Sequence, residues 1–232
     1  MMRQFLKAFT LAEVLITLGI IGVVAAMTMP ILIGNYKKHV YYTQFRKAAS
    51  QLEQALKLYQ IDHGCEGDIS ACGTLQSGRL WIPVEIPHFV EDLAKYFNGA
   101  QLINDENVDK LCSYEKIPAK GGSYDSYCIN DSGMQGNYAF KTPDGMLFNF
   151  ALDEGFGHGS IVDINGPYKG PNEMGRDIFV FYMRYDKRLP ATNSGIVWGG
   201  NPNYDDLPCD DNDINDRSGC ATRLMREGKM NY

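Results

Sequence analysis

Glu13 has the most unusual chemistry in this chain, because it places a carboxylate inside an apolar segment. It is the only ionisable side chain between Phe9 and Ile33, and the stretch from Val14 to Met29 is predominantly apolar. A charge held among lipid tails costs about 2.5 kcal/mol or more, so Glu13 calls for a counter-charge. A cut between Ala8 and Phe9 would create one, since the new cationic amine would lie about 6 Å from Glu13 along a helix. A neighbouring copy shifted by this distance along the helix axis could place its amine against the carboxylate.

A second candidate chemistry is calcium binding near the C-terminus. Oxygen side chains alternate along residues 211–216, as in the first half of an EF-hand loop. Asp216 replaces the glycine of the sharp turn and Thr222 stands where the bidentate glutamate would be, so the pattern is not an EF-hand. A solvated acidic loop is the alternative, and we favour it. The candidate ligands are Asp211, Asp213, Asn215 and Asp216. A weaker candidate set, which an Asn-Gly turn also explains, is Asp163, Asn165 and Asp177.

The cysteines indicate an oxidising compartment. All six follow the apolar segment, and an even number beyond a targeting signal favours disulfides outside the cytoplasm. Proximity predicts the pairs Cys65–Cys72, Cys112–Cys128 and Cys209–Cys220, although sequence alone does not fix the pairing. His63 with Cys65 and Cys72 is a zinc alternative, but no Cys-x-x-Cys knuckle occurs in the chain, so disulfides are favoured.

No catalytic constellation is apparent in the sequence. The four histidines, His39, His63, His88 and His158, lack metalloprotease spacing, and there is no Gly-x-Ser-x-Gly elbow or phosphate-binding loop. Asp153 and Glu154 are adjacent, so on a strand their carboxylates would point apart. The net charge of −6 does not suggest a nucleic-acid partner, which requires clustered Lys and Arg. We therefore expect no enzyme, no required cofactor and no nucleic-acid binding.

The apolar segment predicts a membrane-spanning helix, which needs about 20 such residues. A secretory signal peptide cut near Ala25 or Ala26 and a plain membrane anchor are the two alternatives. Basic residues flank both ends of the segment, so the positive-inside count gives no orientation.

Beyond Pro30 the helical pattern becomes amphipathic and ends at Gly64. One apolar stripe must be covered by the downstream chain, and it consists of Tyr41, Phe45, Ala49, Leu52, Leu56 and Tyr59. The predicted organisation is a leader over 1–8, a membrane helix over 9–34, its amphipathic continuation over 35–63, and a globular domain over 64–232.

The globular domain is predicted to be α+β, with the long helix packed on an antiparallel sheet. Residues 64–136 are loop-rich, with one short helix from Phe89 to Phe97. Turn residues at 143–145 and 165–167 separate the expected strands, and 155–159 is expected to form a hairpin tip. Aromatic and β-branched residues predict strands over 138–140, 146–152, 161–164, 178–185 and 195–198.

The N-terminal fifty residues resemble those of the type IV pilin superfamily, which includes type II secretion pseudopilins and minor pilins. The resemblance rests on Lys7-Ala8, the block Phe9-Thr10-Leu11-Ala12-Glu13, the apolar stretch and Pro30, where such helices commonly bend. Two positions depart from the family pattern, since glycine is usual at Ala8 and a large aliphatic residue at Ala12.

The resemblance implies cleavage by prepilin peptidase after Ala8, N-methylation of Phe9, and pairing of Glu13 during filament assembly. It implies a single-pass protein of the bacterial inner membrane whose body lies in the periplasm or on an extracellular filament. The implied partners are other copies, other pilin-like subunits and an inner-membrane assembly platform. The loop closed by Cys209 and Cys220 is similar to the disulfide-bounded loop of many pilins, and the calcium sites of major pseudopilins lie near their C-terminal loops.

These observations lead to three hypotheses about function. The first is a structural subunit of a pilus or secretion pseudopilus, polymerised through its N-terminal helix. The second is a minor tip subunit that binds a surface, a sugar or a secreted protein through its loops. A membrane-tethered enzyme ranks last.

Overall fold

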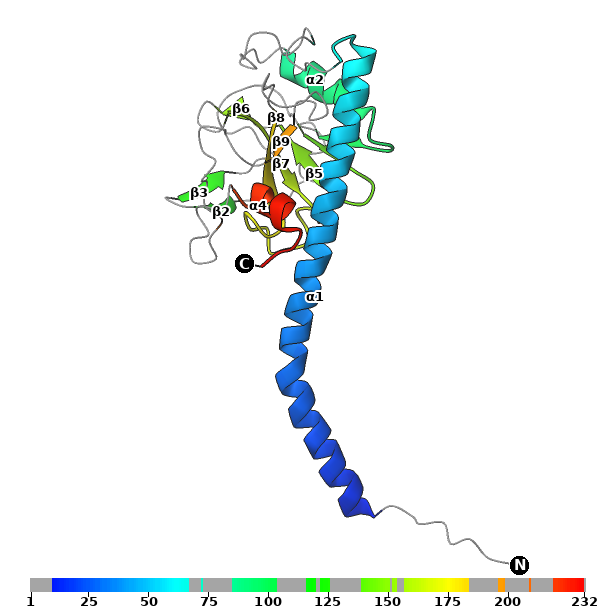
Figure 1. Cartoon of the computed structure of the whole chain (residues 1–232), viewed down its shortest axis with the longest axis vertical. Coiled ribbons are helices and arrows are strands. Elements are labelled where there is room, and N and C mark those ends of the chain that lie inside the picture. Colours follow the sequence, from blue (N-terminus) through cyan, green and yellow to red (C-terminus); the bar gives the residue numbers. More distant parts are fainter. Residues whose placement is uncertain are drawn as a thin grey trace, which may run out of the picture. The chain divides into compact units, whose positions relative to one another are not determined.

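A computed structural model shows the fold of the chain (Figure 1). It describes residues 10–66, 72, 85–103, 116–119, 122–125, 139–150, 152–153, 157–183, 196–198, 209 and 219–231. The chain forms two compact units, Met1–Val40 and Tyr41–Tyr232, and we call the second unit the head.

The long helix α1 extends from Leu11 to Asp62 and enters both units. It continues through Pro30 without a break in its helical assignment, although proline removes one main-chain hydrogen bond. It ends where His63 and Gly64 form a turn, and Gly64 has a left-handed φ of 66°. The predicted long N-terminal helix and its end at Gly64 are confirmed.

The part of α1 inside the head buries one face. The buried side chains recur every three or four residues, and they are Phe45, Ala48, Ala49, Leu52, Ala55, Leu56, Tyr59 and Gln60. The Phe45 ring centroid lies 4.8 Å from that of Phe179 and 5.6 Å from that of Phe181, both on strand β8. The predicted apolar stripe therefore packs on the sheet, with Tyr41 only partly buried at its edge.

The main sheet is antiparallel throughout its described pairings and has seven strands in the order β1-β4-β5-β7-β8-β9, with β6 paired to β7. A separate hairpin joins β2 and β3. The bounds are β1 Gln101–Ile103, β2 Lys116–Ala119, β3 Gly122–Asp125, β4 Ala139–Lys141, β5 Leu147–Asn149, β6 Leu152–Asp153, β7 Gly157–Asp163, β8 Ile178–Met183 and β9 Ile196–Trp198. The expected α+β class and antiparallel sheet are confirmed, while β1, β2 and β3 lie in the segment that the sequence predicted to be loop-rich.

Within the described residues the head also contains the short helices α2, at Glu85–Ala94, and α4, at Cys220–Glu227. The rings of Phe89 of α2 and Tyr59 of α1 pack edge to face with their centroids 5.2 Å apart, which extends the aromatic core. Helix α4 buries Cys220, Ala221 and Leu224, and it is found where no helix was predicted.

The turn between β4 and β5 is confirmed, because Gly145 N–H donates to Thr142 O at 2.9 Å. The predicted hairpin tip at 155–159 is wrong for its last three residues. Gly157 and His158 pair with Asp153 and Leu152, so β7 begins at Gly157. The sequence pattern suggested a tip because glycines alternate here, yet glycine is also tolerated where a strand begins.

Candidate functional site

The first half of α1 presents an apolar surface that nothing else in the described chain covers. It is the one described helix that is long and apolar enough to cross a membrane. Its large side chains are exposed on every side of the helix, with Leu11 81% and Met27 70% accessible. A surface of this kind requires lipid or other apolar helices as its surroundings.

Glu13 lies in the first turn of α1, where it forms a capping box with Thr10. Its Oε2 atom accepts hydrogen bonds from Thr10 N–H and from Thr10 Oγ1, each at 2.8 Å. Thr10 Oγ1 in turn accepts the Glu13 N–H at 3.3 Å. This reciprocal arrangement satisfies main-chain donors that the start of a helix leaves without partners.

The capping box changes the interpretation of Glu13, because the carboxylate has partners within its own chain. The role of Thr10 was not predicted from the sequence, although Thr-x-x-Glu immediately before an apolar run is the known signature of such a box. The hydrogen bonds give Glu13 a role in any membrane helix, so they do not by themselves indicate assembly. They supply no positive charge, and the requirement for a counter-charge in lipid therefore stands. The cleavage-site residues Ala8 and Phe9 lie outside the described residues.

Two of the three predicted disulfides are present, Cys65–Cys72 and Cys209–Cys220. The zinc alternative is wrong for Cys65 and Cys72, because their sulfur atoms are bonded to each other. Cys112 and Cys128 lie outside the described residues. Arg223 of α4 donates to Cys209 O at 2.7 Å, so the ends of the C-terminal loop are held by a hydrogen bond as well as a covalent bond.

The first set of candidate calcium ligands, at 211, 213, 215 and 216, also lies outside the described residues, so the choice between calcium binding and a solvated acidic loop stays untested. The weaker set around Asp163 is described, and its carboxylates already accept hydrogen bonds from N–H groups. Asp163 Oδ1 accepts from Asn165 N and Gly166 N at 3.0 and 2.7 Å. This is the geometry of an Asn-Gly turn, as the alternative explanation proposed.

Asp177 is the centre of the same loop and is fully buried. Its two oxygens accept from Asn172 N at 2.8 Å and Glu173 N at 2.7 Å, and from the Asn165 side-chain amide at 3.3 Å. Burial raises the pKa of Asp177, although these hydrogen bonds oppose the shift. These hydrogen bonds stabilise the β7–β8 loop. Among the described residues, no group of three or more His, Cys, Asp or Glu is placed to hold a metal ion.

The residues considered for catalysis lie on separate elements. His63 follows the last turn of α1, His88 lies in α2 and His158 in β7. His39 belongs to the exposed part of α1, and Asp153 to β6. Glu154 lies outside the described residues. Of these residues, the structure describes the side chains of His39, His63 and His88, and no two of the three lie in the same turn or contact each other in its hydrogen bonds and ion pairs.

Comparison of the chain with protein families, with curated proteins and with solved structures returns no match.

Proposed function

We propose that this chain is the structural subunit of a filament of the type IV pilus or type II secretion pseudopilus kind. In this proposal prepilin peptidase removes residues 1–8 at the inner membrane, Phe9 is N-methylated, and copies polymerise through the first half of α1. The single observation that carries the proposal is that the two halves of one continuous helix have different surroundings. Its first half exposes apolar side chains in all directions, whereas its second half is built into the head.

This division supports a subunit whose membrane helix exchanges lipid for neighbouring helices. Lipid and a bundle of identical helices are both apolar surroundings, so side chains such as Leu15 and Ile21 can pass from one to the other at little cost. Gly19 and Gly22 add shallow positions where a neighbour can approach, because no other atom lies within 4 Å of where their Cβ atoms would be. Helix packing then supplies the cohesion of the filament.

Glu13 would set the axial register of this packing. Its charge needs a cation in the apolar interior, and the amine of Phe9 on an adjoining copy would provide one. Thr10 holds the carboxylate at the start of the helix, where an incoming amine can reach it. The head, stapled by Cys65–Cys72 and Cys209–Cys220, would face outward, which fits an oxidising compartment.

The proposal is tested by expressing the full chain with a prepilin peptidase and an assembly platform and then shearing the cells. We expect the chain in the sheared, sedimenting fraction, as filaments visible by electron microscopy. Recovery only in the membrane fraction, from cells that assemble a known subunit with the same machinery, would count against it. The tip-subunit hypothesis predicts a copy number of about one per filament, which quantitative immunoblotting of the same fraction measures.

A further inference from the structure

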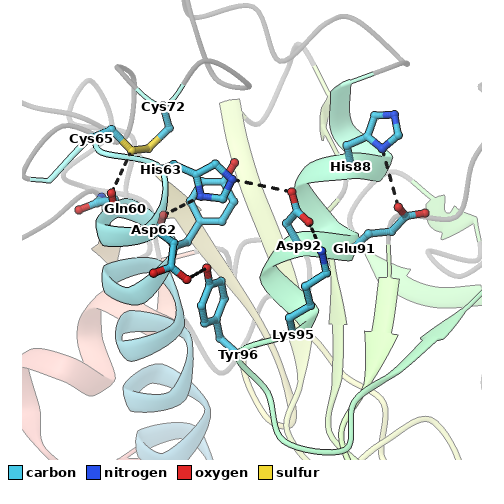
Figure 2. Close-up of polar contacts among 11 residues, drawn as sticks. Gln60, Asp62, His63, Cys65, Cys72, His88, Glu91, Asp92, Lys95 and Tyr96 are labelled. Atoms are coloured by element: carbon cyan, nitrogen blue, oxygen red, sulfur yellow. Dashed lines mark hydrogen bonds and ion pairs between the residues drawn. A yellow bond between two sulfur atoms is a disulfide. The ribbon is translucent and has the colours of Figure 1, made fainter.

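The end of α1 and helix α2 meet through a set of polar side chains (Figure 2). Tyr96 donates a hydrogen bond from its hydroxyl to Asp62 Oδ2 at 2.6 Å. Tyr96 lies in the turn that follows α2. Tyr59 of α1 and Phe89 of α2 pack edge to face with ring centroids 5.2 Å apart. Among the described residues, α1 therefore contacts α2 through an aromatic pair and the turn after α2 through a hydrogen bond, and His63 stacks on Tyr59.

His63 has a fixed tautomer in this arrangement. Its Nδ1 atom lies 2.8 Å from Tyr59 O, and the ring stacks on the Tyr59 ring at 3.9 Å. A main-chain carbonyl can only accept a hydrogen bond, so Nδ1 must carry a proton. In the neutral imidazole the proton-free nitrogen is therefore Nε2, and its lone pair is free to accept a proton or a hydrogen bond.

The Nε2 atom faces a carboxylate. It lies 3.8 Å from Asp92 Oδ2 on α2, with each side chain about one-third exposed. This distance exceeds that of a hydrogen bond. With neutral imidazole the contact sets one acceptor against another, which is unfavourable. A proton on Nε2 turns the same pair into a donor and an anion, and closing the gap by about 1 Å would complete a charge-assisted hydrogen bond.

Two described groups beside this pair, Lys95 and Tyr96, keep their protons near neutral pH because the pKa of each is raised. Lys95 donates to the other oxygen of Asp92, and this contact raises the Lys95 pKa. Burial and the bond to Asp62 raise the pKa of Tyr96 to about 12, so it remains a donor. On the other side of α2, His88 Nδ1 lies 3.8 Å from Glu91 Oε2 within the same helix.

We propose that His63 and Asp92 form a proton-operated clasp between α1 and α2, which closes when His63 takes up a proton from solvent. The clasp stabilises the docking of α2 at acidic pH, where Nε2 carries a proton, and this stabilisation is lost when the proton leaves at higher pH. It responds to the acidity of the surroundings outside the cytoplasm. The inference uses only contacts within the head and does not depend on the proposed filament function.

Hydrogen exchange of the full chain in detergent micelles tests the clasp. Exchange of the α2 amides is measured at about pH 7.5 and about pH 5.5, after correction for the intrinsic pH dependence of exchange. We expect protection of α2 to increase about two- to fivefold at the lower pH, the range expected for a partly exposed ion pair. His63→Gln should abolish this increase while keeping a polar side chain at the position.

His88→Gln is the matched control, because it removes a histidine at the same distance from a carboxylate in a pair that does not bridge the two helices. It should keep the increase seen in the wild type. Asp92→Asn is the second variant, and it should behave like His63→Gln. A gain in protection that survives in both His63→Gln and Asp92→Asn, or no gain in the wild type, would overturn the proposal.

Discussion

Replacing Glu13 with glutamine is expected to reduce filament formation more than tenfold while leaving the start of α1 intact. Glutamine can keep the capping box with Thr10, since either residue serves at this position of the motif. It cannot supply the negative charge that pairs with a neighbouring amine. In the variant, the neighbouring amine would be left as an unpaired charge in the membrane, at a cost of about 2.5 kcal/mol or more, which corresponds to well over a tenfold change in equilibrium. The amount of chain in the sheared filament fraction measures the effect.

Thr10→Ala is the complementary variant for this experiment. It removes both hydrogen bonds to Glu13 that involve Thr10 Oγ1 but leaves the carboxylate charge in place. Loss of a helix cap costs about 1 kcal/mol, so a smaller reduction is expected than for Glu13→Gln. If Glu13 served only as a cap, Thr10→Ala would reduce assembly more than Glu13→Gln. Thr10→Ala would then impair assembly, whereas Glu13→Gln would leave it unchanged.

Gly166→Ala is expected to destabilise the head by about 2–5 kcal/mol. Gly166 has a φ of 86°, and a Cβ there would lie 2.2 Å from Gly145 O in the β4–β5 turn. A left-handed residue other than glycine costs about 1–2 kcal/mol, and a clash with main-chain atoms adds a further 1–3 kcal/mol. The carboxylate of Asp163 also accepts the Gly166 N–H, so the turn cannot move away freely.

Gly64→Ala provides the matched control for Gly166→Ala. Gly64 has a similar φ of 66°, but no other atom lies within 4 Å of its Cβ position. Only the conformational cost of about 1–2 kcal/mol should appear, without the added cost of a clash. Urea titration of the full chain in detergent, followed by tryptophan fluorescence, measures both variants. Equal destabilisation by the two substitutions would contradict the close approach of the β4–β5 turn and the β7–β8 loop.

The elements that sequence predicted best are those with a strong, repeated pattern. The apolar run and the stripe from Phe45 to Tyr59 predicted both halves of α1, because a helix that buries one face must repeat its apolar residues every three or four positions. Strand β8 is rich in aromatic and β-branched residues and β7 contains Ile161 and Val162, and the pairing of the two strands is antiparallel as expected. Proximity in sequence was enough to predict Cys65–Cys72 and Cys209–Cys220.

The elements that sequence missed are short and carry weak patterns. Helix α4 has only eight residues, and it follows an aspartate-rich segment that drew attention to metal binding instead. Strand β2 contains Pro118, which lowers its apparent strand propensity. Helix α2 begins at Glu85, four residues before the predicted start, with Pro87 in its first turn, where proline is tolerated. Because proline is common in the first turn of a helix, Pro87 could have indicated where α2 begins.

The candidate site was predicted only in part, for a physical reason. Glu13 was predicted because a lone charge in an apolar run is conspicuous, whereas Thr10 was not predicted because it carries no counter-charge and acts as a hydrogen-bond donor. The clasp at His63 could not be predicted from sequence, since Asp92 lies 29 residues further along the chain and meets His63 only after α2 packs on α1.

Mass spectrometry of the N-terminus of the mature protein tests the central claim most directly. The account predicts a chain that begins at Phe9 and carries a methylated amine, because that amine is the proposed counter-charge of Glu13. A chain with Met1 intact would indicate a plain anchor, and a chain that begins near Met27 would indicate a secretory signal. Either of these results would contradict a filament subunit assembled through its N-terminal helix.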